Sequence, residues 1–212
     1  MNVIARSVWG ASPGSLPSFN MRLPATQVFI HHTVTNPTGD IYADMRAIEK
    51  IGLQRFGQFP YSYVVHSHNG EILEGCGLRR GAHTAERNST SFGVAWVGDY
   101  NERAPKVSQL DATRQLINYL WRNGWLIPAA DIMGHRDVMA TACPGNKLYA
   151  VLDVIRHPWE GTMPDDVPQA QAPVVAFEVS PTGKGYWIVT ADGAVFAFGD
   201  ATYHGRVAAP TR

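Results

Sequence analysis

Several stretches of the chain carry the apolar pattern of strands. Residues 27–32 (QVFIHH) form a short apolar run that ends in two histidines, and residues 91–97 (SFGVAWV) form another run. Residues 61–68 and 71–74 flank Asn69-Gly70, a dipeptide that favours a two-residue hairpin turn. The pattern therefore predicts two buried strands and a hairpin in the first half of the chain.

Other stretches have apolar residues at helical spacing. Residues 40–56 show this period with Asp40 as the expected N-cap, and residues 108–123 show it most clearly, with Ser108 at the start of what resembles a capping box. A third helix is expected near residues 147–156. Strands and helices in this order indicate an α/β fold, with a single central mixed β-sheet flanked by helices.

Changes in local composition divide the chain into three parts. Residues 1–160 hold the predicted strands and helices, after an irregular lead-in over residues 1–26. Residues 161–173 contain three prolines among polar residues and are expected to be a linker. Residues 174–212 alternate apolar and polar positions, which predicts a short C-terminal β-hairpin segment too small for a core of its own.

Overall composition excludes some classes of function. Among the 212 residues, Lys+Arg and Asp+Glu both number 18, so the formal net charge is zero and nucleic-acid binding is not expected. No apolar run reaches the roughly 20 residues of a membrane span. The N-terminus lacks the pattern of a secretory signal peptide, so synthesis in the cytoplasm is expected.

A set of histidines and a cysteine suggests a metal site. Zinc hydrolases use three protein ligands and leave a fourth position for water. His31 and His32 end a predicted buried strand, while His135 and Cys143 lie in one segment, GHRDVMATACPG. His135 and Cys143 lie eight positions apart, which is too far for one face of a helix. This segment must therefore loop back, as Pro144-Gly145 allows.

Six motifs occur in order along the chain: SVWGA, FIHHT, YSYVVHSHNG, GAHTAERN, NSTSFGVAWVGDY and GHRDVMATACPG. With these motifs, the sequence from about Ser7 to Trp159 resembles the N-acetylmuramoyl-L-alanine amidases of the peptidoglycan recognition protein and phage lysozyme group. The resemblance implies the fold of that family, a zinc cofactor and bacterial peptidoglycan as the partner. It implies hydrolysis of the amide between N-acetylmuramic acid and L-alanine of the stem peptide.

The resemblance also assigns roles to residues. The family's zinc ligands fall on His31, His135 and Cys143. The family's groove tyrosine falls on Tyr61, whose hydroxyl is expected to orient water or donate to the oxyanion. Thr141 stands two residues before the cysteine, where phage lysozymes have lysine, and is expected to add a second hydrogen bond.

Further polar residues are assigned to the substrate or to the fold. His83 and Asn88 match groove positions of the family, and Arg136 follows a ligand directly, where it can meet substrate or brace the loop. His32 is expected on the opposite face of its strand from His31. The histidines beside Asn-Gly, at positions 66 and 68, are expected to be solvated.

The biological role has several readings. A phage endolysin released by a holin, acting as a monomer, is the first. A bacterial autolysin, a non-catalytic peptidoglycan-binding module and a cysteine peptidase using Cys143 with His135 are the others. The segment GKGYWIVTADGAVFAFGDATYHG resembles a repeat of actinobacterial surface proteins and wall hydrolases, present here once. It is expected to bind the cell wall or to be part of a longer array.

Overall fold

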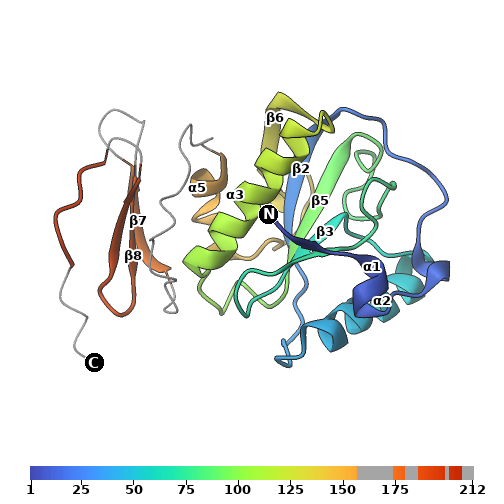
Figure 1. Ribbon diagram of the computed structural model, residues 1–212, viewed down its shortest axis with the longest axis horizontal. Coiled ribbons are helices and arrows are strands. Elements are labelled where there is room, and N and C mark those ends of the chain that lie inside the picture. Colours follow the sequence, from blue (N-terminus) through green and yellow to red (C-terminus); the bar gives the residue numbers. More distant parts are fainter. Residues whose placement is uncertain (157–173, 180–185, 199–200, 207–212) are drawn as a thin grey trace.

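The computed structural model describes residues 1–156, 174–179, 186–198 and 201–206 (Figure 1). Its main sheet has the strand order β1-β4-β3-β5-β2-β6. Only the β3–β4 pair is antiparallel, so the sheet is mixed, as predicted. The strands are β1 Val3–Ile4, β2 Ala25–His32, β3 Tyr63–Val65, β4 Ile72–Glu74, β5 Ser91–Trp96 and β6 Leu126–Gly134.

Helices cover both faces of this sheet, which confirms the predicted fold class (Figure 1). The helices and 3₁₀ turns are α1 Arg6–Trp9, η1 Pro13–Ser15, α2 Ile41–Phe56, α3 Val107–Arg122, η2 His135–Asp137, α4 Asn146–Tyr149 and α5 Leu152–Arg156. Among the described helices, none combines the length and the apolar character that a membrane crossing requires.

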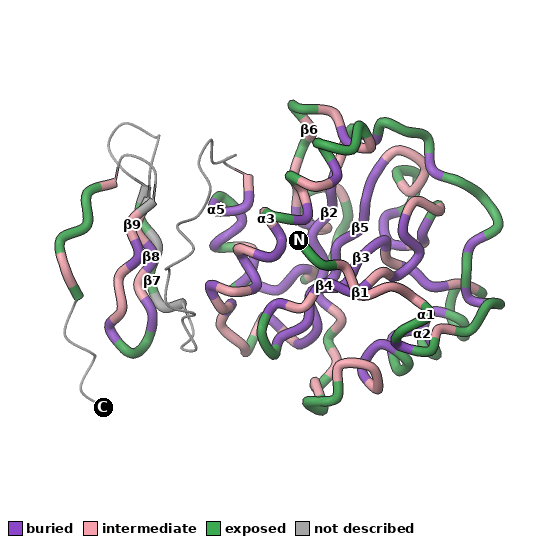
Figure 2. Tube along the Cα trace, viewed as in Figure 1, coloured by how far each residue is buried: buried purple, intermediate pink, exposed green. Residues whose placement is uncertain are grey.

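Alternation along the strands divides the core into two apolar layers. Figure 2 shows that β3 and β5 are buried, whereas the edge strand β6 is partly exposed. In β2, Val28 and Ile30 belong to the cluster that α3 and α5 complete. The opposite face carries a smaller cluster, in which Val64 of β3 packs with side chains of α1 and α2 such as Trp9 and Met45. Because side chains alternate between faces, His31 is on the α2 side of the sheet and His32 is on the α3 side.

The ends of the long helices follow local hydrogen bonding. Asp40 Oδ1 accepts the N–H groups of Tyr42 and Ala43 at 2.9 and 3.0 Å, so Asp40 is the N-cap of α2, as predicted. The predicted capping box of α3 is wrong, because Ser108 lies inside the first turn. The Gln109 side chain instead accepts from the backbone of Lys106, the residue before the helix, at 3.3 Å.

The two-residue hairpin predicted at Asn69-Gly70 is also wrong. Val65 pairs with Ile72, so six residues connect β3 to β4. Gly70 has a φ of 79°, and a Cβ there would come within 2.5 Å of the Ser108 carbonyl oxygen. The glycine is needed for close approach to α3 rather than for a tight turn.

Several short or irregular elements differ from the predicted pattern. The lead-in over residues 1–26 contains β1, α1 and η1, each too short to show a period. The edge strand β6 contains Pro128, and its pairing with β2 shifts register between Ala25 and Gln27. The third predicted helix is split into α4 and α5.

The C-terminal residues form a second sheet, of order β7-β8-β9 with antiparallel pairing. Its strands are β7 Val174–Val179, β8 Tyr186–Thr190 and β9 Val195–Phe198. The expected hairpin segment is present, whereas the predicted linker at 161–173 lies outside the described residues. Ile188 and Phe196 are buried in the same apolar cluster as side chains of α3 and α5, so the small sheet packs against the larger domain.

Candidate metal centre

Strand pairing brings the two predicted histidine ligands together. Strands β2 and β6 are parallel neighbours, with Ile30 opposite Gly134. The residue after Ile30 is His31, and the residue after Gly134 is His135. Their ring centroids are 4.6 Å apart. His31 is 1% exposed, whereas His135 is half-buried at the start of η2.

The loop after η2 returns Cys143 to the same place. The Arg136 N–H donates to the Cys143 carbonyl oxygen at 3.0 Å, and the guanidinium of Arg136 donates to carbonyl oxygens of Ala142 and Cys143 and to Asn146. The same guanidinium lies 4.8 Å from the ring centre of Tyr149. These contacts show that Arg136 braces the loop; its contact with substrate stays a prediction.

The donor atoms fit a zinc ion. One atom from each of His31, His135 and Cys143 lies within 4.8 Å of the other two. The separation of His31 Nδ1 and Cys143 Sγ is 3.6 Å. Tetrahedral zinc with a Zn–N bond of about 2.0 Å and a Zn–S bond of about 2.3 Å requires about 3.5 Å. Two imidazoles and a thiol are also the ligand types that zinc prefers.

The electrostatic environment keeps both imidazoles neutral. Burial lowers the pKa of His31 well below its usual 6.5, and the neighbouring His83 and His135 lower it further. Burial likewise lowers the pKa of His135. Burial raises the pKa of the Cys143 thiol to about 11, although the His32 backbone N–H and Arg136 oppose this. Without a cation beside it, the thiol is protonated at neutral pH.

These shifts predict a pH-dependent stability of the metal-free protein. His31 and the buried His83, whose pKa burial lowers to about 3, stay unprotonated in the folded chain below pH 6.5, while the unfolded chain takes up protons. Their stabilising contribution is complete above pH 6.5 and is lost as the pH falls. His83 alone should cost about 2 kcal/mol at about pH 5, and His31 adds to this. Urea unfolding at about pH 7.5 and about pH 5 measures the loss; equal stabilities would contradict the prediction.

Tyr61 and Thr141, the two predicted hydrogen-bond donors, each lie beside a candidate metal ligand. The Tyr61 ring centroid is 5.3 Å from that of His31. Burial, followed by the charge of Cys143, raises the pKa of the Tyr61 phenol, so its hydroxyl remains a donor. Thr141 is exposed, and its Oγ1 accepts the Cys143 N–H at 3.2 Å. The Thr141 hydroxyl hydrogen remains available for a ligand.

The GAHTAERN segment places two buried polar side chains, His83 and Thr84, beside His31. His83 is 6% exposed, and its ring centroid is 5.3 Å from that of His31. Asn88 Oδ1 accepts the backbone N–H groups of His83 and Thr84 at 2.9 and 2.8 Å, so Asn88 holds this segment in shape. Thr84 touches both imidazoles and was not singled out from the sequence; its place directly after His83 was the one available signal.

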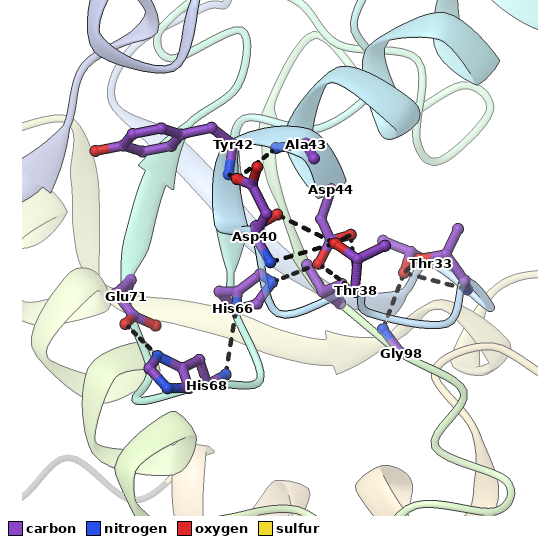
Figure 3. A network of polar contacts seen from close by, with 12 residues as sticks. Thr33, Thr38, Asp40, Tyr42, Ala43, Asp44, His66, His68, Glu71 and Gly98 are labelled. Atoms are coloured by element: carbon purple, nitrogen blue, oxygen red, sulfur yellow. Dashed lines mark hydrogen bonds and ion pairs between the residues drawn. The ribbon is translucent and has the colours of Figure 1, made fainter.

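The side chains of three further histidines, His32, His66 and His68, lie in different surroundings. His32 packs on the α3 side, the face expected for it, where its Nδ1 accepts the Tyr100 N–H at 3.1 Å. The prediction that His66 is solvated is wrong, because His66 is 1% exposed. Its Nε2 lies 2.8 Å from Asp44 of α2, and its Nδ1 accepts the His68 N–H (Figure 3). His68 itself is exposed, as predicted.

The Asp44–His66 pair ties helix α2 to the loop after β3. Asp44 also accepts from the backbone N–H and the hydroxyl of Thr38 (Figure 3). Asp44→Ala should leave these donors without their acceptor and lower the free energy of unfolding by about 2–4 kcal/mol. Urea unfolding checks this against Asp131→Ala, an exposed aspartate whose loss should cost less than about 0.5 kcal/mol. Equal small losses would show that the pair is not stabilising.

Comparisons with known proteins agree with this arrangement. A family model described as N-acetylmuramoyl-L-alanine amidase matches residues 21–146. Peptidoglycan-recognition protein SD of Drosophila melanogaster is 30% identical over 71% of this chain and 83% of its own length. The N-acetylmuramoyl-L-alanine amidase of Sus scrofa is 36% identical over 69% of this chain, which corresponds to 26% of the pig protein.

A solved structure extends the likeness to three dimensions. Drosophila PGRP-LB superposes with a TM-score of 0.65 at 32% sequence identity, covering 72% of this chain and 92% of the other. The matched family segment includes His31, His135 and Cys143, the three residues whose donor atoms meet at the candidate metal centre. This chain belongs to the N-acetylmuramoyl-L-alanine amidase family.

Proposed function

We propose that this chain is a zinc-dependent N-acetylmuramoyl-L-alanine amidase that cuts the amide between N-acetylmuramic acid and L-alanine in bacterial peptidoglycan. The observation that carries the proposal is the meeting of two neutral imidazoles and a thiol within 4.8 Å, beside the phenol of Tyr61. Membership of the amidase family supports this amide as the bond that is cut.

Each residue of the site has a stated task in this proposal. His31, His135 and Cys143 would hold the zinc. When bound, zinc supplies activation of a water molecule near neutral pH and polarisation of the scissile carbonyl. Tyr61 donates its hydroxyl hydrogen to the oxyanion, since its raised pKa keeps it protonated. The hydroxyl of Thr141, two residues before Cys143, would give a second hydrogen bond to the oxyanion.

Two alternatives are less well supported. A cysteine peptidase needs a thiolate nucleophile, but burial raises the pKa of Cys143 to about 11, and its sulfur lies among groups arranged as ligands. A non-catalytic binding module does not need the complete donor set or the protonated Tyr61 beside it. Both alternatives remain outcomes of the test below.

The test is digestion of a purified soluble muropeptide, with mass analysis of the products. The proposal expects two products, a sugar that keeps its lactyl carboxylate and a peptide with a free L-alanine amine. A chelator should stop the reaction, and added zinc should restore it. Cleavage inside the stem peptide that survives the chelator would identify a peptidase. Binding without any cleavage in the zinc-loaded protein would identify a recognition module.

The cellular role is a further part of the proposal. The chain would act as a phage endolysin, released to the cell wall by a holin, as a monomer. Residues 1–160 would be the catalytic domain, 161–173 the linker and 174–212 a wall-binding element. Expression in a susceptible host should lyse cells only when a holin is co-expressed. Lysis without the holin would favour an autolysin with its own route to the wall.

A further inference from the structure

Thr84 lies between two imidazoles of the site. Its Oγ1 is 3.4 Å from His31 Nε2 and 3.1 Å from His83 Nδ1. The side chain is almost fully buried, with 1% of the residue exposed. On the other side of the His31 ring, Nδ1 is the nitrogen that faces Cys143 Sγ. The side chains of His31, Thr84 and His83 therefore follow one another in a line that leads from the metal centre into the protein.

Only one placement of the ring and hydroxyl protons along this line leaves His31 Nδ1 free to bind a metal. A ligand nitrogen carries no proton, so a His31 that binds through Nδ1 has its proton on Nε2 and donates it to Thr84 Oγ1. The Thr84 hydroxyl hydrogen can then be donated to His83 Nδ1. This leaves the proton of the neutral His83 ring on Nε2. The reverse direction would place a proton on His31 Nδ1 and block the metal.

The surroundings of His83 agree with this direction. Its ring lies against Gly93, where a Cβ would come within 2.4 Å of the ring, so the imidazole has little room to turn. Burial lowers the pKa of His83 to about 3, so the ring is neutral and carries a single proton. Since Thr84 occupies Nδ1, that proton belongs on Nε2. Nε2 itself lacks a partner in hydrogen-bonding geometry among the described residues.

We infer that Thr84 is a positioning residue whose hydroxyl holds His31 in the tautomer that presents Nδ1 to zinc. Because it accepts from His31 and donates to His83, Thr84 fixes both rings with a single hydroxyl. The inference rests on the proposed zinc site, but it concerns a residue that touches neither zinc nor substrate.

Thr84→Val and Thr84→Ser separate the hydroxyl from the shape of the side chain. Valine keeps the branched shape and removes the hydroxyl, whereas serine keeps the hydroxyl. Competition with a chromophoric chelator should show zinc affinity lowered about 10–100-fold in the valine variant and nearly unchanged in the serine variant. Urea unfolding of the metal-free variants identifies any general loss of fold. Equal zinc affinity in all three proteins would overturn the inference.

Nitrogen-15 NMR of the histidine rings gives a second measurement that does not depend on turnover. In the wild-type protein, His31 should be protonated at Nε2, and His83 should also be protonated at Nε2. In Thr84→Val the His83 ring should lose this preference, even without zinc. A wild-type protein that binds no zinc would contradict the proposed function, whereas a His83 tautomer unaltered by valine would contradict the role of Thr84. The two failures are therefore distinguishable.

Discussion

Cys143→Ser should lose zinc affinity by more than about 100-fold and with it nearly all turnover. Replacing groups that merely support a metal ligand lowers affinity by about 10–100-fold, so removing a ligand should do more. A hydroxyl is a much poorer zinc ligand than a thiolate. The sulfur of the half-buried Cys143 also accepts the His32 N–H, a contact that holds it beside His31. Metal analysis should find about one zinc per wild-type chain and far less in the variant.

The second cysteine supplies the matched control. Cys76 is buried and free, and its sulfur donates to the Arg79 carbonyl, away from the metal donors. Cys76→Ser keeps a donor in that position and should retain both zinc and turnover. If Cys143→Ser kept full zinc content, or if the wild-type protein worked at full rate without metal, the assignment of Cys143 as a ligand would be wrong.

Tyr61→Phe should keep zinc bound and lower kcat by about 10²–10³-fold, the usual effect of removing one donor to an oxyanion. The protonated hydroxyl of Tyr61 is the expected donor, and the substitution removes it. The ring, which packs beside His31, is retained in phenylalanine. A zinc content of about one equivalent together with lowered kcat on a soluble muropeptide would agree with the prediction.

Tyr42→Phe is the control for this change, because Tyr42 packs against the same apolar cluster as Tyr61. It should leave kcat unaltered. Wild-type kcat in Tyr61→Phe would mean that Tyr61 serves only as part of the groove wall. Parallel loss of zinc and activity would mean that the ring supports His31 and that the hydroxyl is not a donor in the reaction.

The sequence predicted the parts of this molecule that depend on period and motif. The apolar periods located β2, β5, α2 and α3 to within one or two residues, and Asp40 was placed correctly as an N-cap. The strand-end His31 and the looped segment with His135 and Cys143 indicated the metal set, which the structure brings together. These features are local, so a single sequence contains them.

Features decided by long-range contacts were not predictable in the same way. His66 stood beside an Asn-Gly pair and looked solvated, yet Asp44, from a helix far away in the sequence, buries it. Gly70 looked like a turn residue, but it is required by the approach of α3. Strand β6 has one neighbour and contains Pro128, so its sequence lacks the continuous apolar run of an inner strand. Thr84 became visible only through its two imidazole neighbours.

The position of β6 at the edge of the sheet ties metal retention to a local movement. Two of the three donors, His135 and Cys143, follow this strand, whereas His31 belongs to the neighbouring β2. A chain still being synthesised cannot assemble the site before residue 143 has emerged and β6 has found its register. In the finished protein, fraying of this edge strand would separate the donors without unfolding the rest. If zinc is bound as proposed, the rate at which it passes to a scavenging chelator would report how often this single strand detaches.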